Sequence, residues 1–90
     1  MSIFFRLRDN IIPQQNIEEF DKIFNIHENS LSNDDYDELL GAALYHYNLS
    51  IITSLNLFIR QFNIKTTKYG ILRGVYYAKC RNNSRKFPND

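Results

Sequence analysis

The fold of this chain is decided by residues 32–62, SNDDYDELLGAALYHYNLSIITSLNLFIRQF. Apolar residues recur there every three or four positions, the spacing that places side chains on one face of an α-helix. The first helix would present Tyr36, Leu39, Leu40, Ala43, Leu44 and Tyr47, and the second would present Leu49, Ile52, Leu55, Ile59 and Phe62. We therefore predict two helices in this stretch.

Capping residues mark where these helices begin. Ser32 can accept a hydrogen bond from the first turn, and Asp35 stands three residues later in an acidic variant of the capping box. Asn48 suits a cap or turn between the two helices. Because the connection is so short, the two helices should be antiparallel neighbours.

A membrane span is the alternative reading of residues 39–59, which contain no charged side chain and are long enough to cross a bilayer. The polar run Tyr-His-Tyr-Asn at residues 45–48 would be costly at the centre of a bilayer. We therefore predict two short helices and no membrane span.

Upstream, Ile17, Phe20, Ile23 and Phe24 follow helical spacing. This helix would begin either with Asn16 as its cap or with Pro13 as its first residue. Residues 2–9 fit a helix or an alternating strand, and we favour the helix.

Downstream, residues 67–80 suit a helix that begins at a Thr67 cap. Gly70, Gly74 and the β-prone Val-Tyr-Tyr at 75–77 count against a helix and leave a strand as the alternative. Residues 82–90 are rich in polar residues and are expected to form a flexible tail.

Ninety residues make a single domain, 1–90, because a chain of this length can bury only one core. The fold class that follows is all-α: a small bundle or short solenoid of four to five helices in antiparallel helix-turn-helix pairs. The core should contain Phe20, Phe24, Leu40, Ala43, Leu44, Ile52, Leu55, Ile59 and Phe62.

The middle helix pair resembles an ankyrin repeat. Leu39-Leu40-Gly41-Ala42-Ala43, four further residues, and then Leu49-Ser50-Ile51-Ile52 and Leu55 are similar to the first and second helices of that family. The sequence departs from the family because it lacks the Thr-Pro-Leu-His opening and has Tyr-His-Tyr-Asn in place of the usual glycine turn. The resemblance implies a scaffold that binds other proteins through its exposed surface.

Residues that could carry catalysis or bind a metal are few. His27, His46 and Cys80 have no zinc-type spacing, and the three glycines form no phosphate-binding loop. We therefore expect no metal, no cofactor and no enzymatic activity.

A single cysteine excludes an internal disulfide. Residues 1–10 lack the apolar run of a signal peptide, so we expect a cytoplasmic protein.

The charges are segregated along the chain although the net charge is only +1. Every acidic residue except Asp90 lies between positions 9 and 38, whereas residues 60–86 contain basic residues and no acidic one. Such a dipolar surface can steer charged partners. The two halves can equally neutralise each other within the fold.

The function favoured by these features is binding of another protein. In its most concrete form the chain is an immunity or inhibitor protein that blocks a toxin, a nuclease or another enzyme with a basic cleft. The predicted binding site is the acidic start of the helix beginning near residue 33, with the loop before it: Asp34, Asp35, Asp37, Glu38, His27 and Glu28. A solvated helix end is the ordinary alternative for such a run of charge.

Nucleic-acid binding is the second functional hypothesis. It would use a basic surface in the C-terminal half, formed by Arg73, Lys79, Arg81 and Arg85. Tyrosines at 69, 76 and 77 are interleaved with these cations, and aromatic rings beside basic groups are typical of proteins that bind single strands.

Overall fold

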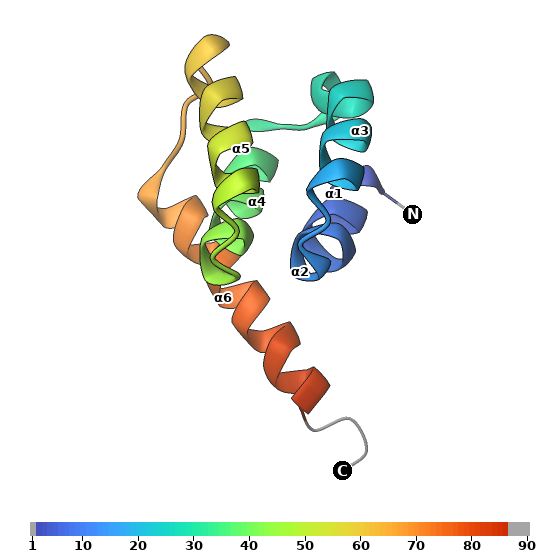
Figure 1. Cartoon of the computed structure of the whole chain (residues 1–90). Helices are drawn as coiled ribbons and strands as arrows, with labels where there is room; N and C mark the ends of the chain where they lie inside the picture. Colours follow the sequence, from blue (N-terminus) through green and yellow to red (C-terminus); the bar gives the residue numbers. More distant parts are fainter. Residues whose placement is uncertain (1, 87–90) are drawn as a thin grey trace.

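The computed structural model describes residues 2–86, apart from the side chains of residues 28 and 83–86. Its elements are α1 (Ile3–Arg6), the π-helix η1 (Leu7–Ile11), α2 (Ile12–Gln14), α3 (Ile17–His27), the 3-10 turn η2 (Glu28–Ser30), α4 (Asn33–Tyr45), α5 (Leu49–Gln61) and α6 (Lys68–Lys86). The elements α1, η1 and α2 form one continuous helical run (Figure 1). Within residues 2–86 no strand occurs, so the predicted all-α fold class is confirmed.

The N-terminal run is helical, as favoured, but its middle is a π-helix. The N–H of Ile12 donates to the carbonyl of Leu7, five residues back. Pro13 follows directly, and its ring has no N–H and would press on the preceding turn of a regular α-helix. The wider π-helical turn accommodates this proline. Arg8 and Asp9 lie within the π-helix η1.

The predicted caps are confirmed because they depend only on neighbouring residues. Ser32 and Asp35 form a reciprocal capping box at the start of α4. The side chains of Asn48 and Asn16 accept from the amides of Ile51 and Glu19, and so cap α5 and α3. Each polar side chain satisfies an amide that the first helical turn leaves unpaired.

Helix α4 lies at the centre of the molecule, packed against α5, α6 and the N-terminal run. Its buried side therefore extends almost all round, over Leu39, Leu40, Ala42 and Ala43. The prediction that Leu44 belongs to the core is wrong: Leu44 is exposed, and it lies in the last turn of α4, one residue before the helix ends at Tyr45.

Two other predicted core residues, Phe62 and Ile52, and one predicted apolar-face residue, Tyr47, also need correction. Phe62 is exposed because it lies at the C-terminal cap of α5, where its ring only covers Phe58 from outside, with ring centroids 4.4 Å apart. Tyr47 is exposed because α4 ends at Tyr45 and the chain turns through a left-handed conformation at Tyr47 (φ 56°). Ile52 is only partly buried, packed at the edge of the core.

Helix α6 crosses α4 at very short range through glycine. A Cβ atom on Gly41 would overlap the carbonyl oxygen of Ile71, and one on Gly74 would overlap the backbone of Glu38. The glycines that counted against a helix are thus what allows α6 to pack on α4. The predicted Thr67 cap is present, since its Oγ1 accepts from the amide of Gly70.

The C-terminal half of α6 projects beyond the other helices (Figure 1). Residues 82–86, which we expected to belong to a flexible tail, continue the helix as far as Lys86. The rest of that expected tail, residues 87–90, lies outside the described residues.

Over the part of the chain that is described, no helix is long and apolar enough to span a membrane.

Candidate functional site

Asp37 is not part of an exposed acidic site. It is 1% exposed, and its Oδ2 accepts hydrogen bonds from the amide and the hydroxyl of Thr67, at 3.1 and 3.0 Å. The carboxylate therefore lies at the N-terminal end of α6, where helical amides need acceptors and negative charge is favoured. Asp37 fastens α6 to α4, and the prediction that it faces a partner is wrong.

Glu38 is also occupied inside the protein. Its Oε1 accepts from Nη1 of Arg8 at 3.0 Å, and its Oε2 lies 3.6 Å from Nε of Arg73. Only 13% of its side chain is exposed. Two cations from different helices therefore neutralise this carboxylate.

Asp9 completes this network of ion pairs. Arg8 forms a bidentate pair with it, at 2.7 Å from Nε and 3.0 Å from Nη2, and Nε of Arg81 lies 3.6 Å away. The hydrogen bond to Asp9 raises the pKa of Arg8. We name Arg8, Asp9, Glu38, Arg73 and Arg81 the arginine–carboxylate network. It ties the N-terminal run, α4 and α6 together, so part of the segregated charge is neutralised within the fold.

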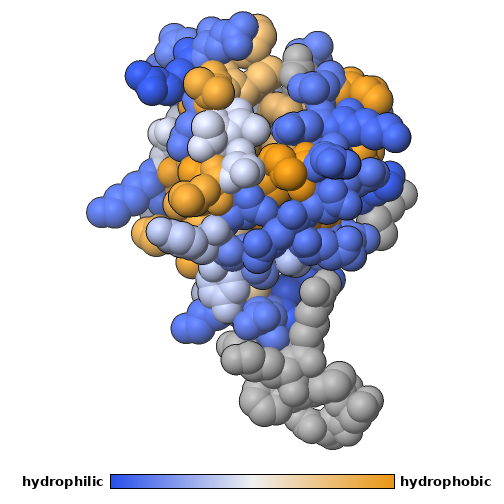
Figure 2. Space-filling view, viewed as in Figure 1, coloured by the Kyte–Doolittle hydropathy of each residue, from blue (hydrophilic) through white to orange (hydrophobic). Residues whose placement is uncertain are grey.

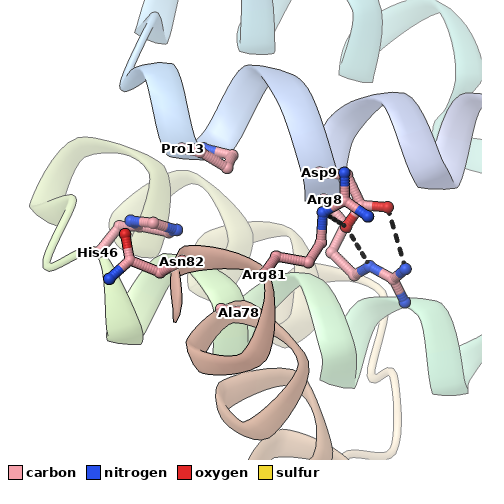
Figure 3. Close-up of a pocket in the computed structure, with 7 residues that line it drawn as sticks. All are labelled: Arg8, Asp9, Pro13, His46, Ala78, Arg81 and Asn82. Atoms are coloured by element: carbon pink, nitrogen blue, oxygen red, sulfur yellow. Dashed lines mark hydrogen bonds and ion pairs between the residues drawn. The ribbon is translucent and has the colours of Figure 1, made fainter. Parts of the chain in front are cut away.

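A small polar pocket opens beside this network (Figure 3). Arg8 and Asp9 line one side of it, Arg81 reaches towards Asp9 from α6, and His46 and Asn82 stand at the other end. The hollow has a volume of about 20 Å³, space for about one water molecule. It is too small for an organic substrate, and its side chains form part of the packing between α6 and its neighbours.

The remaining residues of the predicted acidic site do not form a cluster of exposed acids with them. Asp34 is exposed, whereas Asp35 is half-buried and accepts from the backbone of Ser32 within the capping box. His27 is half-buried at the end of α3, and Glu28 lies in η2 with its side chain outside the described residues. Of the four acids on α4, Asp34 is exposed, Asp35 and Glu38 are partly buried, and Asp37 is buried.

The predicted basic surface is reduced in the same way. Arg73 and Arg81 pair with Glu38 and Asp9. Lys79 is exposed, and Arg85 lies on α6 with its side chain outside the described residues. A second exposed lysine, Lys68, stands at the first residue of α6.

The side chains of α6 are distributed in an unusual way. The helix buries a stripe of small residues, Gly70, Gly74 and Ala78, against the protein. Ile71 is partly buried against the core, whereas three larger side chains of α6 point away from it: Tyr69, Leu72 and Tyr76 are 81%, 56% and 63% exposed. Together with Arg73 they line a shallow hollow of about 260 Å³. We name these four residues the outer face of α6.

Tyr76 stays a neutral phenol on this face. A hydrogen bond with the side chain of Cys80 is the main reason that the pKa of Tyr76 is raised above its ordinary value. Since the ordinary pKa of tyrosine is already about 10, the ring carries no charge at neutral pH. The hollow is therefore lined by apolar and neutral surface with one cation, Arg73, at its edge.

Exposed apolar residues also occur elsewhere, and Phe5 and Tyr77 line a second hollow of about 390 Å³ next to Arg73. On the face drawn in Figure 2, hydrophilic side chains dominate and apolar ones form separate spots. On α5, Leu49 and Leu57 are exposed singly, about two helical turns apart. Single exposed apolar residues are ordinary on protein surfaces, whereas a stripe that lines a hollow needs a reason.

No group of histidine, cysteine, aspartate or glutamate that could hold a metal ion exists among the described residues. No family model, no curated protein and no solved structure matches this chain. The ankyrin resemblance therefore stays a prediction, and the outer face of α6 is the candidate site that the geometry offers.

Sequence reasoning placed Arg73, Tyr69 and Tyr76 only on a basic surface for nucleic acid, and it missed their apolar stripe with Leu72 for a definable reason. Tyr69, Leu72 and Tyr76 stand at positions i, i+3 and i+7, a spacing that normally indicates the buried side of a helix. The available signal was the second stripe, Gly70, Gly74 and Ala78, since small residues four apart allow one helix to approach another closely. Two stripes on opposite sides of one helix indicate two different neighbours.

Proposed function

We propose that this chain is a non-catalytic protein-binding module that docks its partner on the outer face of α6. The observation that carries the proposal is the stripe Tyr69, Leu72 and Tyr76, which faces solvent on the side of α6 opposite its buried Gly70, Gly74 and Ala78. Side chains exposed to this extent bury little apolar surface on folding, so they contribute little to stability. Aromatic residues and arginine are the residue types that contribute most to protein interfaces.

The surrounding structure fixes the position of the helix that carries this face. Asp37 binds Thr67, the cap of α6, the glycine crossing packs the first turns of α6 on α4, and Arg73 pairs with Glu38. A face already ordered in the free protein loses little conformational entropy on binding. The arrangement therefore supports a preformed docking surface.

An immunity or inhibitor protein is one form that such a module can take. That form was expected to use the acidic start of α4, but Asp37 is buried and Glu38 is paired. We therefore propose the outer face of α6 for binding in place of the acidic helix start. A toxin or other enzyme remains a proposed class of partner.

Nucleic-acid binding is the second candidate, because α6 contains several basic residues, no acidic residue, and exposed tyrosine rings. Aromatic rings beside cations can stack bases. Against it, Arg73 and Arg81 already have carboxylate partners. Binding to phosphates depends on how many cations are available for neutralising them.

The test is capture of the partner with matched variants. Leu72→Asp places a charge in the outer face of α6, whereas Leu57→Asp places the same charge at an equally exposed leucine on α5. The partner is identified by mass spectrometry, and its binding is confirmed with purified proteins. We expect Leu72→Asp to lower the affinity for this partner by about 100-fold or more. Leu57→Asp should bind like wild type.

The opposite pattern would contradict the proposal: a partner retained by Leu72→Asp and lost by Leu57→Asp. Both variants should unfold in urea within about 0.5 kcal/mol of wild type, because both leucines are exposed. Equal stability ensures that a lost partner reports the surface and not the fold.

A further inference from the structure

The outer face of α6 has the form of one half of a helix–helix interface. Tyr69, Leu72 and Tyr76 follow one another at i, i+3 and i+7 along a 19-residue helix. This spacing is that of the seam by which amphipathic helices pack on each other. The shallow hollow between the rings of Tyr69 and Tyr76 is lined by Leu72 and Arg73 and has room for apolar side chains from a second helix.

Cations flank this stripe along one edge. At 100° per residue, Lys68 and Lys79 fall on the same side of the line through Tyr69, Leu72 and Tyr76. Both lysines are exposed, and three helical turns separate them, about 16 Å along the helix axis. No acidic residue occurs between Lys68 and Lys86, so α6 itself offers these lysines no counter-charge.

The charges argue against two other occupants. A second copy of the chain packed through the same face would bring lysine and arginine side chains against each other, and like charges across an interface are unfavourable. A nucleic-acid strand would bring a dense row of phosphates to a face whose hollow is apolar and whose Arg73 is already paired with Glu38. Charge complementarity favours an acidic protein segment.

We propose that the outer face of α6 binds an acidic amphipathic helix, a partner class that rests on the proposed protein-binding function. Apolar side chains of this helix pack between Tyr69, Leu72 and Tyr76. Carboxylates on one edge of the helix, about three turns apart, lie against Lys68 and Lys79. The apolar contacts supply most of the affinity, and the charges select the partner and its orientation.

The experiment uses three synthetic 18-residue helical peptides with the same apolar stripe. Their flanking positions, three turns apart, carry glutamate, glutamine or lysine. Binding to the full chain is measured by fluorescence anisotropy at low salt. We expect the glutamate peptide to bind about tenfold more tightly than the glutamine peptide, because two exposed ion pairs contribute modestly, and the lysine peptide to bind most weakly.

Charge-reversed variants give the specific control. Lys68→Glu with Lys79→Glu should reverse the order of the three peptides. Lys22→Glu with Arg60→Glu changes the net charge equally at two exposed positions on α3 and α5, and it should keep the wild-type order. If net charge alone were responsible, both double variants would change the order of the three peptide affinities in the same way. That result would overturn the proposal.

The outcomes separate this proposal from the function on which it rests. Equal binding of the three peptides, abolished by Leu72→Asp, overturns the acidic partner and leaves the outer face as a protein-binding surface. Peptide binding that Leu72→Asp leaves unchanged contradicts both the acidic partner and the outer face as the binding surface.

Failure of all three peptides to bind overturns the proposal of a helical partner. Tight binding of an oligothymidylate that depends on Leu72, or self-association that depends on it, assigns the face to nucleic acid or to a second copy and likewise overturns the proposal.

Discussion

Gly41→Leu should lower the free energy of unfolding by more than about 3 kcal/mol, enough to threaten a domain of this size. The new Cβ would overlap the carbonyl oxygen of Ile71 and press on the backbone at Gly74. These neighbours are backbone atoms, so no side chain can rotate away, and α4 and α6 would have to separate. Urea denaturation followed by circular dichroism measures the loss.

The control places the same side chain on an exposed helical position. Asn56→Leu on α5 adds a leucine that meets only solvent, and it should change stability by less than about 0.5 kcal/mol. A Gly41→Leu protein as stable as Asn56→Leu would contradict the close crossing of α4 and α6, and with it the position of the outer face.

Asp37→Ala should destabilise the protein by about 2 kcal/mol, through loss of its hydrogen bonds to Thr67, the residue that caps α6. The change removes the acceptor of two hydrogen bonds and leaves the Thr67 amide without its carboxylate partner. The favourable charge at the start of α6 disappears as well. Denaturation in urea at neutral pH measures the difference.

Asp37→Asn separates the hydrogen bonds from the charge. Asparagine has nearly the same shape and can still accept from Thr67, so it should lose only about half as much stability. Asp34→Ala is the control for an exposed acid on the same helix and should be close to neutral. If Asp37→Ala were as stable as Asp34→Ala, Asp37 would not fasten α6.

The parts of the fold that sequence reasoning predicted correctly depend on neighbouring residues. Ser32 and Asn48 cap helices that begin within three residues of them, and the apolar spacing that follows each cap is local too. The burial of Leu44 and Phe62 was predicted wrongly because it depends on where α4 and α5 end.

The candidate site was harder to predict because its decisive contacts join distant residues. Asp37 looked like one more acid at a helix start, and only the approach of Thr67, thirty residues later, makes it a buried partner of the cap of α6. The pairing of Arg73 with Glu38 likewise follows from the glycine crossing. Charge runs read along a sequence do not show which charges the fold itself neutralises.

Photo-crosslinking from position 72 tests the central claim most directly. The protein is expressed in its native host cells with the photo-reactive residue p-benzoylphenylalanine in place of Leu72. In the control, the same residue replaces Leu57. Both positions are exposed to a similar degree. We predict one light-dependent adduct of defined mass from position 72 and none from position 57. An adduct from position 57 with none from position 72 would contradict the assignment of the outer face of α6 as the binding surface.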